Sequence, residues 1–189
     1  PRQLLVAATT GALSAQLALP SMESPPDTTP AWIVDPSGPL RGDVAVRGSK
    51  NGITKHLVAS MLGRTPSTIS NSPDVGDVDI TISMLEALGC VVHKDEDRIT
   101  VDPQPISSSR VPLRFSGMNR IPILMVGPLL HCVGEAFVPL VGGDDIGSRP
   151  IDFHVQALEK MGAEIIITDE GLEAKAGELR GAHIELPYP

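Results

Sequence analysis

Apolar residues recur along residues 40–101 with two different spacings, and each change of spacing marks a change of predicted element. Val44 and Val46 lie two residues apart, the spacing that places both side chains on one face of a strand. Residues 51–62 and 78–88 repeat apolar positions every three or four residues, as helices do, and Gly63 and Gly89 follow them as helix ends. The predicted order is strand, helix, strand, helix and hairpin, at residues 44–46, 51–62, 67–70, 78–88 and 90–101. This stretch therefore predicts one βαβαββ unit.

The same unit returns 73 residues later in the chain. Four positions repeat at that distance, Asp79, Leu85, Glu86 and Gly89 becoming Asp152, Leu158, Glu159 and Gly162. A third unit begins where Leu179-Arg180-Gly181 repeats Leu40-Arg41-Gly42, with Ile184 and Leu186 in place of Val44 and Val46. The sequence predicts an α/β (α+β) fold of repeated βαβαββ units, truncated in the third. Because a stacked unit cannot bury its face without a neighbour, we expect a fragment of a larger repetitive protein.

The first 37 residues differ in composition from the rest. Residues 21–39 hold five prolines among Ser, Thr and Asp, which is typical of a linker, and residues 4–19 are apolar and rich in alanine. The chain begins with Pro1 rather than Met, so we expect its start to be lost or processed. The predicted organisation is an N-terminal extension and Pro-rich linker at 1–37 and a partial domain at 38–189.

Composition and charge narrow the classes of function. The 189 residues hold 15 Lys and Arg against 23 Asp and Glu, a net charge of −8, which would repel a phosphate backbone and argues against nucleic acid as a partner. Apolar stretches are broken by proline or charge well short of the ~20 residues that a membrane span needs, so no membrane association is expected. Anionic small molecules stay possible through local Lys and Arg.

The cysteines and histidines show no metal-ligand spacing. Cys90 and Cys132 lie in apolar surroundings and belong to no Cys-x-x-Cys motif, so we expect buried free thiols and a reducing, cytoplasmic compartment. The five histidines lack the i,i+3 or i,i+4 pairing of a zinc site. No metal is predicted.

Basic residues stand at three predicted helix starts: Lys50, Arg120 and Arg149. A cation at a helix N-terminus opposes the helix dipole, so it is mildly costly unless an anion lies nearby. Residues 142–152, Gly-Gly-Asp-Asp-Ile-Gly-Ser-Arg-Pro-Ile-Asp, form a glycine-rich loop running into a helix. The functional interpretation is a converging anion site with a mobile acid/base loop. The alternative is a surface turn with a capping pair and solvated first-turn cations.

Four motifs in order resemble one family: 47–51 (Arg-Gly-Ser-Lys-Asn), 119–130 with its Asn-Arg and Gly-Pro-Leu-Leu, the loop 142–152, and 186–189 (Leu-Pro-Tyr-Pro). Together they are similar to the UDP-N-acetylglucosamine 1-carboxyvinyltransferases, a family of enolpyruvyl transferases. The resemblance covers residues 38–189. The loop motif is highly specific, whereas the Lys-Asn pair alone would not be.

The resemblance implies a fold, a reaction and site residues. The family has βαβαββ units, three to each of two domains, in an inside-out α/β barrel that closes on its substrates. It transfers the enolpyruvyl group of phosphoenolpyruvate to the 3-hydroxyl of UDP-N-acetylglucosamine, which begins peptidoglycan synthesis and so serves cell-wall formation and cell division. No metal or organic cofactor is implied. The matched substrate-binding residues are Lys50, Asn51, Arg120, Arg149, Pro150, Ile151, Asp152 and Phe153.

Asp144 falls where most of the family carries a loop cysteine that donates a proton and can attack phosphoenolpyruvate. Actinobacterial-type relatives resemble this chain in having Asp there. A carboxylic acid can deliver the proton if its pKa rises from about 4 toward neutrality. A carboxylate is a poorer nucleophile than a thiolate, so we expect acid catalysis at Asp144, weaker adduct formation and resistance to fosfomycin, an epoxide that alkylates the loop thiol.

Two other interpretations stay open. One is a sister transferase that uses another acceptor, such as a free nucleotide of secondary metabolism or shikimate 3-phosphate. The other is a non-catalytic remnant that binds nucleotide sugar without turnover. The family's second domain contributes a base and further arginines that this chain lacks, so we expect the 189 residues alone to hold half a site and little activity.

Overall fold

A computed structural model describes residues 35–36, 38–143 and 150–186. The chain divides into two units, Pro1–Asp43 and Val44–Pro189. The described residues of the first unit form neither helix nor strand. All elements discussed below belong to the second unit, and the N-terminal extension and most of the Pro-rich linker lie outside the described residues.

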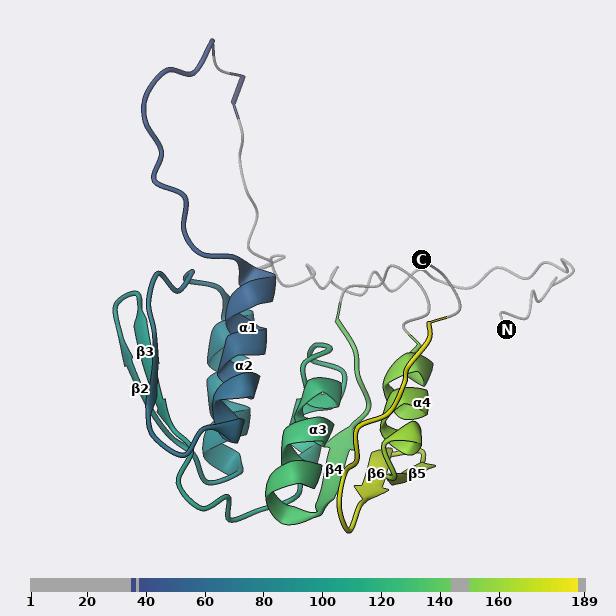
Figure 1. The fold of residues 1–189 in the computed structure, drawn as a ribbon. Helices are drawn as coiled ribbons and strands as arrows, with labels where there is room; N and C mark the ends of the chain where they lie inside the picture. The colour runs from purple at the N-terminus through teal and green to yellow at the C-terminus, as the bar shows by residue number, and fades with distance from the viewer. Residues whose placement is uncertain (1–34, 37, 144–149, 187–189) are drawn as a thin grey trace, which may run out of the picture. The chain divides into compact units, whose positions relative to one another are not determined.

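The first repeat places two helices against a small antiparallel sheet. It contains α1 (Lys50–Ala59) with a short 3-10 turn (Ser60–Leu62), β1 (Ser67–Ile69), α2 (Gly76–Ala87), β2 (Val91–Asp95) and β3 (Arg98–Asp102). The strands lie in the order β1-β3-β2, and the predicted hairpin pairs Asp95 with Arg98 across its turn. Figure 1 shows α1 and α2 side by side, with the β2-β3 hairpin next to them.

The second repeat has the same order of helices and strands, with its 3-10 turn before the first helix instead of after it. It contains a 3-10 turn (Leu113–Phe115), α3 (Pro122–Val133), β4 (Glu135–Pro139), α4 (Asp152–Lys160), β5 (Glu164–Ile167) and β6 (Gly171–Lys175). Its sheet has the order β4-β6-β5. Arg110 forms a parallel bridge to Phe137 on β4. In the second repeat this bridge stands at the place of the first strand of a βαβαββ unit.

The two repeats agree in their backbone detail, which confirms the 73-residue period. Gly89 and Gly162 follow their helices with φ of 106° and 101°, a conformation that glycine adopts without strain. Cys90 donates to the Leu85 carbonyl (3.0 Å), and Ala163 donates to Leu158 (2.9 Å). Gly89 and Gly162 also donate from their amides, to the carbonyls of Glu86 and Glu159. Each pair of bonds forms a Schellman motif, so the two helices end in the same way.

One hydrophobic core joins both repeats. Its fully buried side chains come from all three neighbouring helices and include Leu57 of α1, Leu85 of α2 and Leu129 of α3. Val101 of β3 and Leu172 of β6 close it from the two sheets. Because this core fixes the helices against each other, the positions of their N-terminal ends are also fixed.

The predicted strand at residues 44–46 is wrong. Val44 and Val46 are each 87% exposed, and no described strand pairs with them. A strand forms only where a neighbour satisfies its backbone groups, and alternation alone cannot supply that neighbour. The described part of the predicted third unit also lacks a strand, and Ile184 and Leu186 are exposed there.

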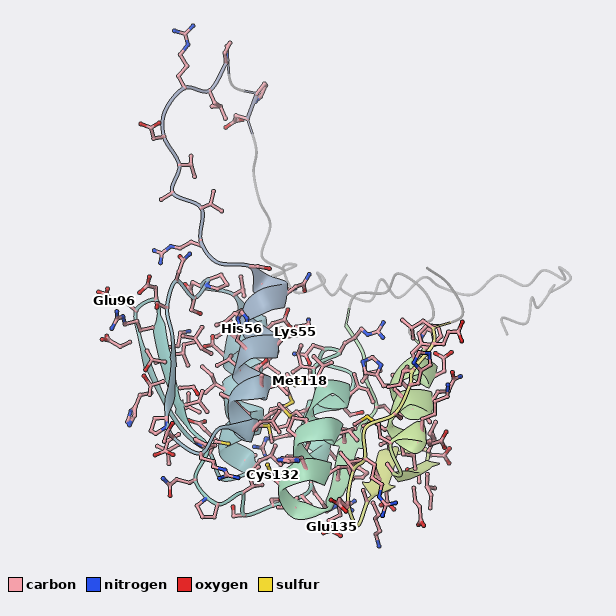
Figure 2. All side chains as sticks on the ribbon, in the orientation of Figure 1. Lys55, His56, Glu96, Met118, Cys132 and Glu135 are labelled. Carbon is pink, nitrogen blue, oxygen red and sulfur yellow. The ribbon has the colours of Figure 1, made fainter. Side chains whose placement is uncertain are left out.

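The cysteine prediction holds in part. Both cysteines are free thiols, and Cys90 is buried as expected. Cys132 is exposed, so the prediction that it is buried is wrong. It lies at the opposite end of α3 from Met118 (Figure 2), where the helix ends and leaves less protein to cover its last turn.

Candidate active site

The N-terminal ends of α1, α2 and α3 meet at one cavity of about 410 Å³. Lys50 is the first residue of α1, and Asp77 is the second of α2. Asn119 and Arg120 lie just before Ile121, the N-cap of α3. Figure 2 labels two lining residues, Lys55 on α1 and Met118 before α3. The lining residues are Lys50, Asn51, Thr54, Lys55, Asp77, Met118, Asn119, Arg120, Ile121, Ile123, Leu124, Gly143 and His154.

Local sequence fixes where α1 begins. The Ser49 side chain caps the helix by accepting a hydrogen bond from the Gly52 amide (3.1 Å). Gly48 donates from its amide to the Asn71 carbonyl (3.0 Å), and a Cβ at Gly48 would lie 2.2 Å from that oxygen. Only glycine permits this approach, so the motif Gly-Ser-Lys-Asn places Lys50 at the edge of the cavity.

A network of polar side chains links the three helix ends. The Lys50 ammonium lies 2.6 Å from Oδ2 of Asp77, and Nδ2 of Asn119 donates to Oδ1 of the same carboxylate (3.2 Å). The buried Asn119 side chain also accepts a bond from the Ile121 amide (3.0 Å). The Lys50 ammonium holds the pKa of Asp77 below its usual value, with help from Asn119 and against the opposing effect of burial. Asp77 is therefore an anion at neutral pH.

Arg120 and His154 also line the cavity. A guanidinium N–H of Arg120 donates to the Pro150 carbonyl (3.1 Å), which ties the start of α3 to the segment before α4. Burial lowers the pKa of His154 on α4, and the positive charge of Arg120 lowers it further. With His154 neutral, the described lining carries three cations, Lys50, Lys55 and Arg120, against one carboxylate. This balance favours an anionic ligand.

Backbone hydrogen bonds attach Gly142 and Gly143, the first two residues of the glycine-rich motif, to the same cavity. Gly142 donates to the Asn119 carbonyl (3.0 Å), and Gly143 donates to Gly117 (3.2 Å). A Cβ at Gly142 would lie 2.0 Å from the Gly117 carbonyl oxygen, so no other residue fits there without displacing the backbone. Gly143, the residue before Asp144, lines the cavity.

The predicted substrate-binding residues fall into three groups. Lys50, Asn51 and Arg120 lie together at the cavity. Pro150 and Ile151 line a separate apolar cavity of about 210 Å³ beside β4 and β6, while Asp152 and Phe153 open α4 and line neither cavity. Asp144 and Arg149 lie outside the described residues.

Sequence reasoning did not select Asp77, Lys55 or His154 as site residues. Asp77 lies just before the predicted helix 78–88, where an acidic residue is common and does not indicate a site. Which helix ends meet is a property of tertiary packing, so the sequence could not assign these residues to a site.

The described part of the chain contains neither a metal-binding cluster nor a membrane-spanning helix. No group of three or more His, Cys, Asp or Glu residues is placed to hold a metal ion there. Among these same residues no helix is both long and apolar enough to cross a membrane.

Known proteins match this chain in sequence over most of its length. The family model described as EPSP synthase (3-phosphoshikimate 1-carboxyvinyltransferase) matches residues 34–189. A UDP-N-acetylglucosamine 1-carboxyvinyltransferase from Chlamydia muridarum is 47% identical over 154 residues, 79% of this chain and 35% of the relative. The protein of the same name from Shewanella amazonensis is 40% identical over 152 residues, 80% of this chain and 36% of the relative. The chain therefore spans about a third of the length of these curated relatives.

Solved structures share the fold at lower identity. The enolpyruvyl transferase NikO from Streptomyces tendae superposes with a TM-score of 0.64 at 20% identity, covering 75% of this chain and 31% of that one. An EPSP synthase from Acinetobacter baumannii gives a TM-score of 0.60 at 17% identity, covering 78% and 35%. These likenesses establish the arrangement of helices and sheets.

Proposed function

Because the chain belongs to the EPSP synthase (3-phosphoshikimate 1-carboxyvinyltransferase) family, we propose that its protein is an enolpyruvyl transferase acting on UDP-N-acetylglucosamine. The protein would transfer the enolpyruvyl group of phosphoenolpyruvate to the 3-hydroxyl of the sugar in the cytoplasm, as the first committed step of peptidoglycan synthesis. The observation that carries this proposal is the meeting of Lys50, Asn51 and Arg120 at one cavity. The shared name of the relatives at 40–47% identity supports this acceptor.

The charges of the cavity suit two anionic substrates. Both phosphoenolpyruvate and the nucleotide sugar carry phosphate, and a charge-assisted hydrogen bond to an anion contributes roughly 1.5–3 kcal/mol. Lys50 supplies a point charge at the N-terminus of α1, where the helix dipole also favours an anion. Arg120, whose guanidinium is planar and always charged, would contact the nucleotide sugar across the cavity.

The reaction needs both proton transfer and displacement of phosphate. The 3-hydroxyl oxygen forms a bond to C2 of phosphoenolpyruvate, its proton passes to a base, and a second proton is added to C3. Loss of a proton from C3 then breaks the bond between C2 and the phosphate oxygen, which restores the double bond and releases inorganic phosphate. We propose Asp144 as the donor of the proton to C3, since Gly143 beside it in the sequence lines the cavity.

Phosphate release by the complete reading frame that contains this chain tests the proposal. We expect release from phosphoenolpyruvate with UDP-N-acetylglucosamine, and none with shikimate 3-phosphate or UMP in its place. Release with either of those acceptors would instead assign the protein to another branch of the family. Nucleotide-sugar binding without phosphate release would identify a non-catalytic remnant.

A further inference from the structure

Asp77 contacts two residues of the cavity with its two carboxylate oxygens. Oδ2 lies 2.6 Å from the Lys50 ammonium, and Oδ1 accepts the Asn119 amide at 3.2 Å. We propose that Asp77 is a positioning residue, which holds Lys50 and Asn119 in the arrangement that binds the phosphate group of phosphoenolpyruvate. The phosphate in this inference rests on the proposed function, whereas the positioning of Lys50 can be tested without it.

The two contacts of Asp77 reach elements that are far apart in the sequence. Lys50 begins α1, while Asn119 precedes α3 and fixes its first turn through the Ile121 amide. One carboxylate on α2 therefore sets the spacing between a cation of α1 and the start of α3. Lys50 has a long side chain with many rotamers, so a fixed partner reduces the entropy that an anion must remove on binding.

The same helix provides an internal comparison. Asp79 also lies in the first turn of α2 and forms an ion pair of 2.7 Å, with Lys94 on β2. The Asp79 side chain is 62% exposed and does not line the cavity, whereas the Asp77 side chain is 20% exposed and does. The two residues thus share charge, helix position and partner type, and differ in whether they face the site.

Charge repulsion alone and the positioning role predict opposite effects of removing the Asp77 charge on phosphate binding. A carboxylate beside an anion site repels the anion, so removing the charge of Asp77 should tighten phosphate binding by Coulomb's law. If Asp77 positions Lys50, the same change should weaken binding, because the ammonium and the Asn119 amide lose their common anchor. The sign of the effect therefore separates the two accounts.

The first experiment measures the positioning alone, in the protein of the complete reading frame and without substrate. Lysine residues are labelled by reductive methylation and quantified by mass spectrometry, with Lys175 as the internal reference. The Asp77 carboxylate stabilises the charged, unreactive amine of Lys50, so Asp77→Asn should raise Lys50 labelling about two- to fivefold, the effect of an ion pair with one exposed partner. Asp79→Asn should raise labelling of Lys94 and leave Lys50 unchanged. Equal Lys50 labelling in wild type and Asp77→Asn would overturn the proposal.

The second experiment measures the consequence in the complete reading frame. Asp77→Asn should raise KM for phosphoenolpyruvate about tenfold, the loss of one well-oriented charged contact, with a smaller change in kcat. Asp77→Glu should recover part of that loss, and Asp79→Asn should stay within about twofold of wild type. An unchanged or lower KM in Asp77→Asn would refute the positioning role. Wild-type protein inactive with every acceptor would refute the proposed function instead, and the labelling result would still decide the role of Asp77.

Discussion

Replacing Lys50 by Ala should affect phosphate binding much more than the stability of the fold. The structure gives this residue two small effects on folding, and they have opposite signs. Its side chain is 58% exposed, so the ion pair with Asp77 contributes only about 0.2–1 kcal/mol to the free energy of unfolding. Its charge at the first position of α1 opposes the helix dipole, and removing it returns about 0.3–1 kcal/mol. The two nearly cancel, so Tm should change by no more than about 2–4 °C.

The effect of the same substitution on activity should be much larger. A charged hydrogen bond to phosphate is worth roughly 1.5–3 kcal/mol, which corresponds to about a ten- to hundredfold loss of kcat/KM for phosphoenolpyruvate. Steady-state phosphate release by the complete reading frame gives this ratio, and thermal unfolding of the same samples gives Tm.

Lys94→Ala is the matched control for that measurement. It removes the same side chain from an ion pair of almost equal length, 2.7 Å to Asp79, away from the cavity. We expect its kcat/KM to stay within about twofold of wild type. Equal losses of activity in Lys50→Ala and Lys94→Ala, or full activity in both, would refute the assignment of Lys50 to phosphate binding.

Four further substitutions test the loop, the histidine and the proposed acid. Gly142→Ala places a Cβ against the Gly117 backbone and should lower Tm, whereas Gly76→Ala, at an exposed position with open space around it at the start of α2, should change Tm by no more than about 2 °C. Since the pKa of His154 lies below its unfolded value near 6.5, stability should fall as pH drops below about 6.5, and His154→Gln should reduce that loss in thermal unfolding scans. Wild-type complete protein should resist fosfomycin, while Asp144→Cys should form an inactivating adduct, seen by mass spectrometry, and shift its pH optimum upward because thiol pKa values start near ~8.5. A wild-type adduct, or an active but resistant Asp144→Cys, would remove Asp144 from the proton-donor position.

The repeated hairpins could be predicted from the sequence because each is determined by neighbouring residues. Gly89 and Gly162 supply the positive φ that ends a helix, and the strands after them pair with segments only a few residues away. The strand predicted at Val44 and Val46 failed because its pairing partner is not set locally. Alternation of apolar residues indicates which face of a strand is apolar, but it does not provide a neighbouring strand for pairing.

Only those cavity residues that belong to a recognisable sequence motif could be predicted. Lys50 and Arg120 stood out because a cation at a helix start is unfavourable without an anion. Asp77 gave no such signal, since an acidic residue in a first turn already stabilises its own helix and needs no further explanation. Only the packing of α1, α2 and α3 shows that its carboxylate faces Lys50 rather than water.

The whole chain and the described lining of the cavity carry net charges of opposite sign. Because charges are screened over distance, the residues that line the cavity determine which ligand binds there. The chain carries −8, yet the described lining of the cavity holds Lys50, Lys55 and Arg120 against Asp77 alone. Physiological salt screens exposed charges beyond about 8 Å, so carboxylates such as Glu135, at the far end of α3 (Figure 2), contribute little to the field inside the cavity. A small anion that enters the cavity meets the local cations at contact distance. A long polyanion would also extend beyond the cavity, along a chain whose net charge is −8, so we propose that this charge distribution admits a phosphorylated metabolite and disfavours a nucleic acid.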